Sequence, residues 1–166
     1  MIGKYVNIAS RCASFINKKF ANQLTATLLD PELFQQFIDE GDTIAVYYEQ
    51  REFGKALRAI MDLADKANQR IDAEKPWSLI KDPEHVVRAH AVCSLGLNLF
   101  RLLTLYLKPV LPVTAQKVEA FFNSPALTWA DRSIPLGNQT IQTFEPLLQR
   151  ISLEALAALQ VVPSEA

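Results

Sequence analysis

The longest apolar stretch of the chain, residues 91–107, restricts its possible folds more than any other feature. It is shorter than the about 20 residues that a membrane-spanning helix needs, and Asn98 and Arg101 interrupt it. A helix that is apolar nearly all round must be enclosed by other elements. We therefore predict a buried helix at the centre of a bundle, beginning near Asp82-Pro83 and continuing to about Lys108, and no membrane contact.

Other segments also carry apolar residues at helical spacing. In the first of them, apolar residues follow an i, i+4, i+7, i+8 pattern from Ile8 to Ile16. Asp30-Pro31 supplies an N-cap with proline at the first helical position. Pro76 ends a later helix, because the residue before a proline is pushed out of the helical region. The predicted helices cover about residues 4–20, 31–50 and 52–73, with a short one after Pro112 that ends near residue 122.

The remainder of the chain shows no clear period. Prolines, a glycine and scattered polar residues predict an irregular connection and tail over residues 124–151, followed by a short helix over residues 153–159. No segment alternates long enough to predict a sheet. A chain of 166 residues fits one domain, so we expect a single domain over residues 1–166. The predicted fold class is all-α: an antiparallel bundle of about five main helices plus the short C-terminal helix.

Patterns typical of catalysis and metal binding are absent from the sequence. Cys12 and Cys93 form no C-x-x-C pair, and His85 and His90 do not share a helical face. The chain has no glycine-rich phosphate loop and no G-x-S-x-G motif. With a net charge of −1, any nucleic-acid binding must depend on a local patch. We expect no catalysis, metal or cofactor in this chain, and, with no secretory leader, a cytoplasmic location.

The polar face of the first predicted helix is the first candidate for such a patch. Lys4, Asn7, Arg11, Ser14 and Lys18 fall on one broad face, and residues 1–20 contain no acidic side chain. Asn7 and Arg11, one turn apart, provide donors and an acceptor that suit the Watson–Crick edge of an unstacked RNA base. The alternative is an ordinary solvated face, which composition alone favours.

The sequence Lys75-Pro76-Trp77 is the second candidate. The proline holds the tryptophan where a helix has ended, and a ring presented in this way can stack on a base. The alternative is a tryptophan that packs in the core or caps the helix. Trp129, whose one basic neighbour is Arg132, is assigned to packing. Acidic and basic residues interleave along the preceding helix, which predicts a solvent-facing surface; they are Asp62, Asp65, Lys66, Arg70, Asp72, Glu74 and Lys75.

Several blocks along the chain resemble the anticodon-binding domain of methionyl-tRNA synthetases of the bacterial type. Each block is weak alone, but together they span nearly the whole chain in the order and spacing of that family. The blocks are Val6-Asn7-Ile8-Ala9-Ser10-Arg11, Phe15-Ile16-Asn17-Lys18, Arg51-Glu52-Phe53-Gly54-Lys55-Ala56, Ala64-Asp65-Lys66-Ala67-Asn68, Lys75-Pro76-Trp77, Asn98-Leu99-Phe100-Arg101 and the segment from Tyr106 to Pro112.

The resemblance implies binding of the CAU anticodon stem-loop of methionine tRNAs. Asn7 and Arg11 match family residues that would recognise the first anticodon base, cytosine, and Pro76 and Trp77 match the pair that would stack on anticodon bases. Five residues around these would be peripheral to the RNA site, and the two acidic ones among them would repel wrong loops. The peripheral set is Lys4, Ser14, Lys18, Asp65 and Asp72.

Two departures from the family pattern limit what this chain does alone. The H-I-G-H and K-M-S-K-S signatures of class I synthetases do not occur, so ATP and magnesium are expected only in a catalytic domain that precedes this chain. That catalytic domain is then a partner, and the tail is expected to return towards it. Leu148, in this tail, stands at a position that is often aromatic in the family.

Two other functions remain open. A sister anticodon domain, for leucine, isoleucine, valine or cysteine, shares the bundle but is not expected to combine the Asn-x-x-x-Arg start with the Pro-Trp stop. A helical scaffold that binds protein helices through an apolar groove would bind with little dependence on salt, whereas phosphate contacts weaken steeply as salt rises.

Overall fold

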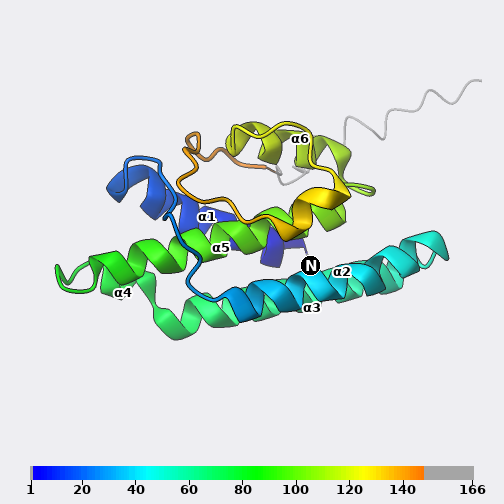
Figure 1. Ribbon diagram of the computed structural model, residues 1–166, viewed down its shortest axis with the longest axis horizontal. Coiled ribbons are helices and arrows are strands. Elements are labelled where there is room, and N and C mark those ends of the chain that lie inside the picture. Colours follow the sequence, from blue (N-terminus) through cyan, green and yellow to red (C-terminus); the bar gives the residue numbers. More distant parts are fainter. Residues whose placement is uncertain (1, 148–166) are drawn as a thin grey trace, which may run out of the picture.

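The computed structural model describes residues 2–147, and its regular structure in that range is helical (Figure 1). Within this range there is no strand, only an isolated antiparallel bridge between Gln23 and Thr140. The predicted all-α bundle with five main helices is confirmed, whereas the helix predicted over residues 153–159 lies outside the described range. The elements are α1 (Ile2–Lys19), α2 (Pro31–Glu49), α3 (Phe53–Glu74), α4 (Pro76–Leu79), α5 (Val86–Leu107), α6 (Pro112–Phe121) and the 3-10 helix η1 (Trp129–Ser133).

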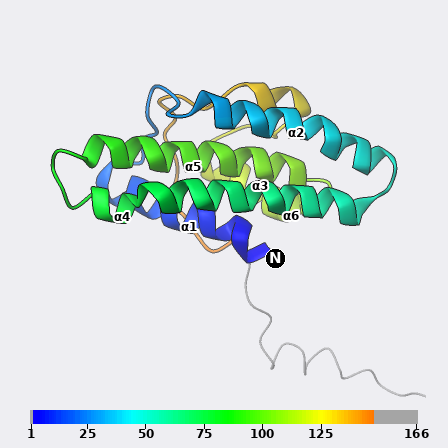
Figure 2. The same ribbon diagram turned by 90° about the horizontal axis from the view of Figure 1, so that it is seen from below.

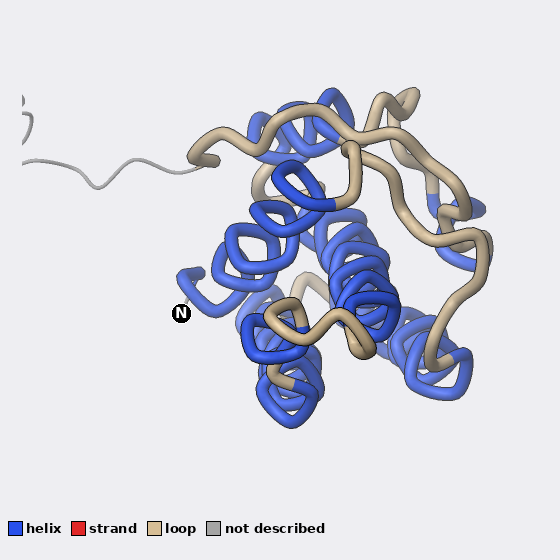
Figure 3. Tube along the Cα trace, turned by 90° about the vertical axis from the view of Figure 1, so that its left-hand side faces the viewer, coloured by secondary structure: helices blue, strands red, loops and turns tan. Residues whose placement is uncertain are grey.

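α5 is the central helix of the bundle, as its composition predicts (Figure 3). Every residue from Val92 to Leu107 is buried, and α1, α2, α3 and α6 all contact this helix. By length and composition alone α5 is apolar enough to cross a membrane, but 72% of its most apolar window is buried inside the bundle. The core of the bundle therefore accounts for its apolar character.

Gly96 lets α1 approach α5 closely. A Cβ atom at this position would lie 2.5 Å from the Sγ atom of Cys12, so a larger residue would force the two helices apart. Glycine costs a helix about 1 kcal/mol relative to alanine, and the close packing offsets that cost. A hydrogen bond with Cys93, together with burial, raises the pKa of the Cys12 thiol well above its usual value. Cys12 is fully buried, and it packs in the contact between α1 and α5.

The predicted start of the central helix is wrong by about one turn, because α5 begins at Val86 and not near Asp82-Pro83. The Asp82 carboxylate instead accepts a hydrogen bond from the backbone amide of Glu84 at 3.0 Å. Such a side-chain turn offers the backbone an alternative to helix, and it delays the start of α5. At α2 the corresponding prediction holds, since Asp30 caps the helix and Pro31 is its first residue.

The connection predicted over residues 124–151 is described as far as Leu147, where it is irregular apart from η1 and packs along the bundle. Asn98 of α5 accepts a hydrogen bond from the backbone amide of Leu136 at 2.8 Å, and its side-chain amide donates to the Leu136 carbonyl at 3.3 Å. The buried Arg101 donates to the carbonyl of Ile134 at 2.8 Å. The two polar residues that interrupt the apolar stretch thus satisfy backbone groups of the connection, as buried polar groups must.

Candidate functional site

α1 and α3 lie side by side and run in the same direction, although they are not consecutive (Figure 2). Three side-chain contacts between them join residues 61 positions apart, so successive turns of the two helices face each other in register. The pairs are Lys4 with Asp65 at 2.9 Å, Asn7 with Asn68 at 3.3 Å, and Arg11 with Asp72 at 2.6 Å. The polar face of the first helix is therefore not simply solvated, because it is tied to α3.

Arg11 lies at the centre of these contacts. Its guanidinium donates to the Asp72 carboxylate and, at 3.3 Å, to the side-chain oxygen of Asn68. The same guanidinium lies 5.3 Å from the ring centroid of Trp77, over the face of the indole. The Arg11 side chain is 26% exposed. The ion pair with Asp72 and the contact with Trp77 thus hold the Arg11 guanidinium in one orientation at the surface. A guanidinium donates hydrogen bonds and accepts none.

Trp77 comes to this place through an abrupt turn at the end of α3. Lys75 adopts a left-handed backbone conformation with φ 51° and ψ 63°, which is costly for a residue with a side chain. Pro76 is buried and occupies the first position of α4, a single turn that carries Trp77 against Arg11. The predicted stop at Pro76 is confirmed, whereas the short helix α4 was not predicted. The Trp77 ring is neither fully buried nor free, because it packs on the core with one face under Arg11.

Asn68 is a site residue that sequence reasoning missed. Its side chain bonds both Asn7 and Arg11, and it joins the two candidates on α1 to α3. The available signal was its spacing, since Asp65, Asn68 and Asp72 follow the i, i+3, i+7 pattern of one helical face. That pattern becomes informative only once α3 is known to face α1.

Of the acidic residues of α3, Asp62 is exposed as predicted, whereas three others are tied into ion pairs, which corrects the prediction of a purely solvent-facing surface. Asp65 and Asp72 pair with basic residues of α1, and Glu74 is only 18% exposed. Glu74 bonds Arg70 on its own helix and Arg88 of α5, at 2.6 Å for Arg88. The bonds from Arg88 and Arg70 lower the pKa of Glu74 to about 2. Glu74 thereby joins α3 to α5 just before the turn that carries Trp77.

Replacing Glu74 with glutamine is expected to destabilise the protein by about 2 kcal/mol at neutral pH. Because the pKa of Glu74 is lowered from 4.5 to about 2, its contribution is complete above pH 5 and disappears as the pH falls towards 2. Urea unfolding of wild type and Glu74→Gln at pH 7 and pH 3 measures this difference. The control is Glu49→Gln, since the exposed Glu49 joins no ion pair among the described residues. An equal loss of stability at both pH values would contradict this assignment.

The remaining predicted positions contribute unequally to the cluster that Asn7, Arg11, Asn68, Asp72 and Trp77 form. Lys4 belongs to it through Asp65, whereas Ser14 and Lys18 make no side-chain hydrogen bond or ion pair within residues 2–147. Among the exposed basic side chains without such a pair in this range, Lys18 and Lys19 stand at the end of α1, and Lys75 follows the end of α3.

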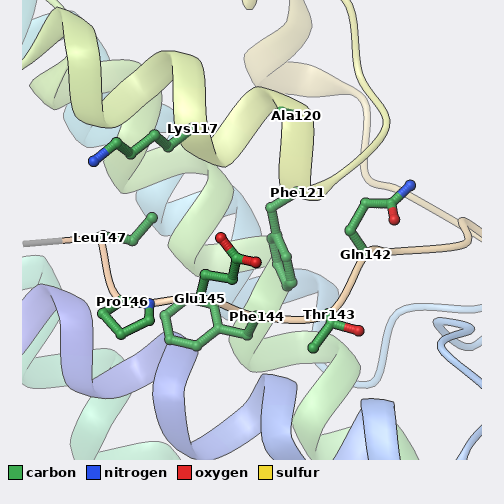
Figure 4. Close-up of a pocket in the computed structure, with 9 residues that line it drawn as sticks. All are labelled: Lys117, Ala120, Phe121, Gln142, Thr143, Phe144, Glu145, Pro146 and Leu147. Atoms are coloured by element: carbon green, nitrogen blue, oxygen red, sulfur yellow. The ribbon is translucent and has the colours of Figure 1, made fainter.

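The described residues hold no group of three or more histidine, cysteine, aspartate or glutamate side chains placed to bind a metal. A cavity of about 420 Å³ lies between α6 and the end of the described chain, lined by residues that include Phe121 and Phe144 (Figure 4). It shares no residue with the cluster of Asn7, Arg11 and Trp77. The arrangement at α1, α3 and α4 suits binding through hydrogen bonds and stacking.

Comparison with known families gives a match over most of the chain. Residues 25–159 match the family described as the anticodon binding domain of methionyl tRNA ligase. Pro76 and Trp77 lie within the matched range, whereas Asn7 and Arg11 precede it.

Curated relatives extend the likeness to α1. A methionine–tRNA ligase of Thiobacillus denitrificans is 50% identical over 159 residues, which cover 96% of this chain and 23% of the relative. Another, from Vesicomyosocius okutanii, is 50% identical over 151 residues, covering 91% of this chain and 28% of the relative. The chain thus spans about a quarter of the length of these relatives.

Solved structures confirm the fold. A crystal structure of Mycobacterium tuberculosis methionyl-tRNA synthetase bound by methionyl-adenylate superposes with a TM-score of 0.77 at 18% identity, covering 89% of this chain and 31% of that one. A second structure of the Mycobacterium tuberculosis protein, in complex with methionyl-adenylate, gives a TM-score of 0.82 at 18% identity, covering 90% and 31%. At this identity the likeness shows a shared helical architecture.

Proposed function

Because the chain belongs to the family of anticodon-binding domains of methionyl-tRNA ligases, we propose that it recognises the CAU anticodon of methionine tRNAs through Asn7, Arg11, Pro76 and Trp77. The observation that carries this proposal is the Arg11 guanidinium held over the Trp77 ring by Asp72 and Asn68. In this proposal the Arg11 guanidinium bonds a base edge and the Trp77 ring stacks on a base face, which is how proteins usually recognise unpaired RNA.

The donor pattern of Arg11 fits cytosine in the first anticodon position. The Watson–Crick edge of cytosine carries two adjacent acceptors, N3 and O2, and arginine has only donors to offer. The amino group of cytosine donates a hydrogen bond, which the side-chain oxygen of Asn7 accepts. Because Asp72 and Asn68 already restrict the guanidinium, little side-chain entropy is lost when the base binds.

Trp77 supplies the stacking surface. Pro76 and the left-handed Lys75 fix the turn that presents the ring, so the ring is oriented before RNA arrives. Base–aromatic stacking contributes roughly 1–3 kcal/mol per base and is largely independent of base identity. Trp77 therefore contributes affinity, and Arg11 with Asn7 contributes selectivity.

The peripheral residues complete the proposed site. In this proposal the exposed Lys18, Lys19 and Lys75 contact phosphates, and Ser14 lies on the same helix between Arg11 and Lys18. Asp65 and Asp72 neutralise Lys4 and Arg11 in the free protein. When RNA binds, the carboxylates of Asp65 and Asp72 are proposed to repel loops that present hydrogen-bond acceptors to them.

In the intact protein this domain would serve a cytoplasmic methionine–tRNA ligase that attaches methionine to its tRNA. The catalytic domain, with its ATP and magnesium, would then be the second partner of this chain besides the tRNA. Residues 1–166 act in this proposal as a single anticodon-binding domain. The family match supports methionine over the sister specificities for leucine, isoleucine, valine or cysteine.

The remaining alternative is a helical scaffold for protein partners, and salt dependence separates the two. Titration of a fluorescent CAU stem-loop into the 166-residue chain at low and high salt measures it. With three phosphate contacts, the affinity is expected to fall roughly 20-fold between about 50 and about 200 mM salt. Binding that does not change with salt would contradict contacts from Lys18, Lys19 and Lys75.

A further inference from the structure

The side-chain amide of Asn68 has a single possible orientation. Its Nδ2 atom lies 3.0 Å from the backbone oxygen of Lys4 and 3.1 Å from that of Ala64. Backbone oxygens only accept hydrogen bonds, so the NH₂ group of Asn68 must face them. Its side-chain oxygen consequently faces the other way, towards the candidate RNA site.

This oxygen in turn determines how Asn7 is oriented. It accepts a hydrogen bond from the Asn7 side chain at 3.3 Å and one from the Arg11 guanidinium at 3.3 Å. Asn7 must therefore use its NH₂ group on Asn68, which leaves its own oxygen directed away from α3. The Asn7 side chain is exposed, so this oxygen is available to a ligand as an acceptor.

From this chain of bonds we infer that Asn68 is a positioning residue that makes Asn7 an acceptor and thereby selects cytosine over uracil in the first anticodon position. The inference rests on the proposed function and extends it to a residue that does not touch the base. Cytosine carries an amino donor at C4, where uracil carries a carbonyl oxygen. With its orientation fixed, the oxygen of Asn7 bonds the amino group of cytosine but faces another acceptor in uracil.

Without the acceptor of Asn68, the Asn7 amide is free to turn by half a rotation and offer its NH₂ group to uracil. In Asn68→Ala the preference for a CAU over a UAU stem-loop is therefore expected to fall about tenfold, and the preference that remains comes from Arg11, whose donors face the N3–H donor of uracil. The measurement is the ratio of the two dissociation constants, from fluorescence titration of the 166-residue chain. The ratio separates loss of selectivity from a general loss of affinity.

Asn68→Asp is the matched variant. Aspartate keeps an acceptor towards Asn7 and Arg11 but donates nothing to the backbone oxygens of Lys4 and Ala64. It is expected to unfold at a lower temperature than wild type and to bind both loops more weakly because of its added charge. The CAU preference is nevertheless expected to remain, since Asn7 is still held as an acceptor.

The outcomes distinguish the possible roles of Asn68. A purely structural role predicts that the CAU preference follows thermal stability, so that Asn68→Asp loses it as Asn68→Ala does. That result would overturn the inference, as would an undiminished preference in Asn68→Ala. A wild-type protein that binds CAU and UAU loops equally would instead overturn the proposed function itself.

Discussion

Replacing Trp77 with alanine is expected to weaken binding of the CAU stem-loop roughly tenfold or more, because the stacking surface of one base is lost. The bundle should stay folded, since Trp77 is only partly buried and stands on a one-turn helix outside the main core. Helix content by circular dichroism and the unfolding temperature verify the fold, and titration of the stem-loop measures the affinity.

Trp129→Ala is the matched control for this experiment. Trp129 also lies under an arginine, with Arg132 at 5.0 Å from its ring centroid, but it stands on η1 and packs against Tyr106. It should therefore alter stability without altering RNA affinity. If Trp77→Ala binds RNA as tightly as wild type, or if both tryptophan variants lose the same affinity, Trp77 has no stacking role.

Replacing Arg11 with alanine is expected to reduce the preference for CAU over GAU loops by about tenfold to a hundredfold. Guanine presents donors where cytosine presents N3 and O2, so the donors of Arg11 find no acceptors there. Removing Arg11 abolishes this distinction together with the contacts to Asp72, Asn68 and Trp77. The ratio of the dissociation constants for the two loops measures the effect.

Lys4→Ala controls for charge in this comparison. Lys4 stands on the same helix and pairs with Asp65 as Arg11 pairs with Asp72, so both variants lose one positive charge and leave one aspartate unpaired. Both should bind RNA more weakly, but Lys4→Ala should keep the CAU preference. Equal preferences in the two variants would show that charge, and not the geometry of Arg11, governs selectivity.

Composition and local chemistry predicted most of the fold. The apolar stretch around Asn98 and Arg101 could only be a central helix, and Asp30-Pro31 fixed the start of α2 because a cap acts on its own neighbours. The start of α5 was missed because the Asp82 carboxylate serves a local turn in place of a cap. α4 was missed because a single turn has no periodicity to detect.

The site was only partly visible in the sequence, because its decisive contacts are long-range. Spacing placed Asn7 and Arg11 on one helical face, and Pro76 marked the stop that presents Trp77. Their meeting depends on α1 and α3 running parallel with an offset of 61 residues, which no local pattern encodes. For the same reason Asn68 was overlooked, and the pairing of Asp65 and Asp72 with residues of α1 was not predicted.

The most direct test of anticodon recognition is a titration of the wild-type chain with CAU and GAU stem-loops at two salt concentrations. Tighter binding of the CAU loop is predicted at both salt concentrations, with both affinities falling as salt rises. Equal affinities for the two loops would contradict recognition of the first anticodon base by Asn7 and Arg11.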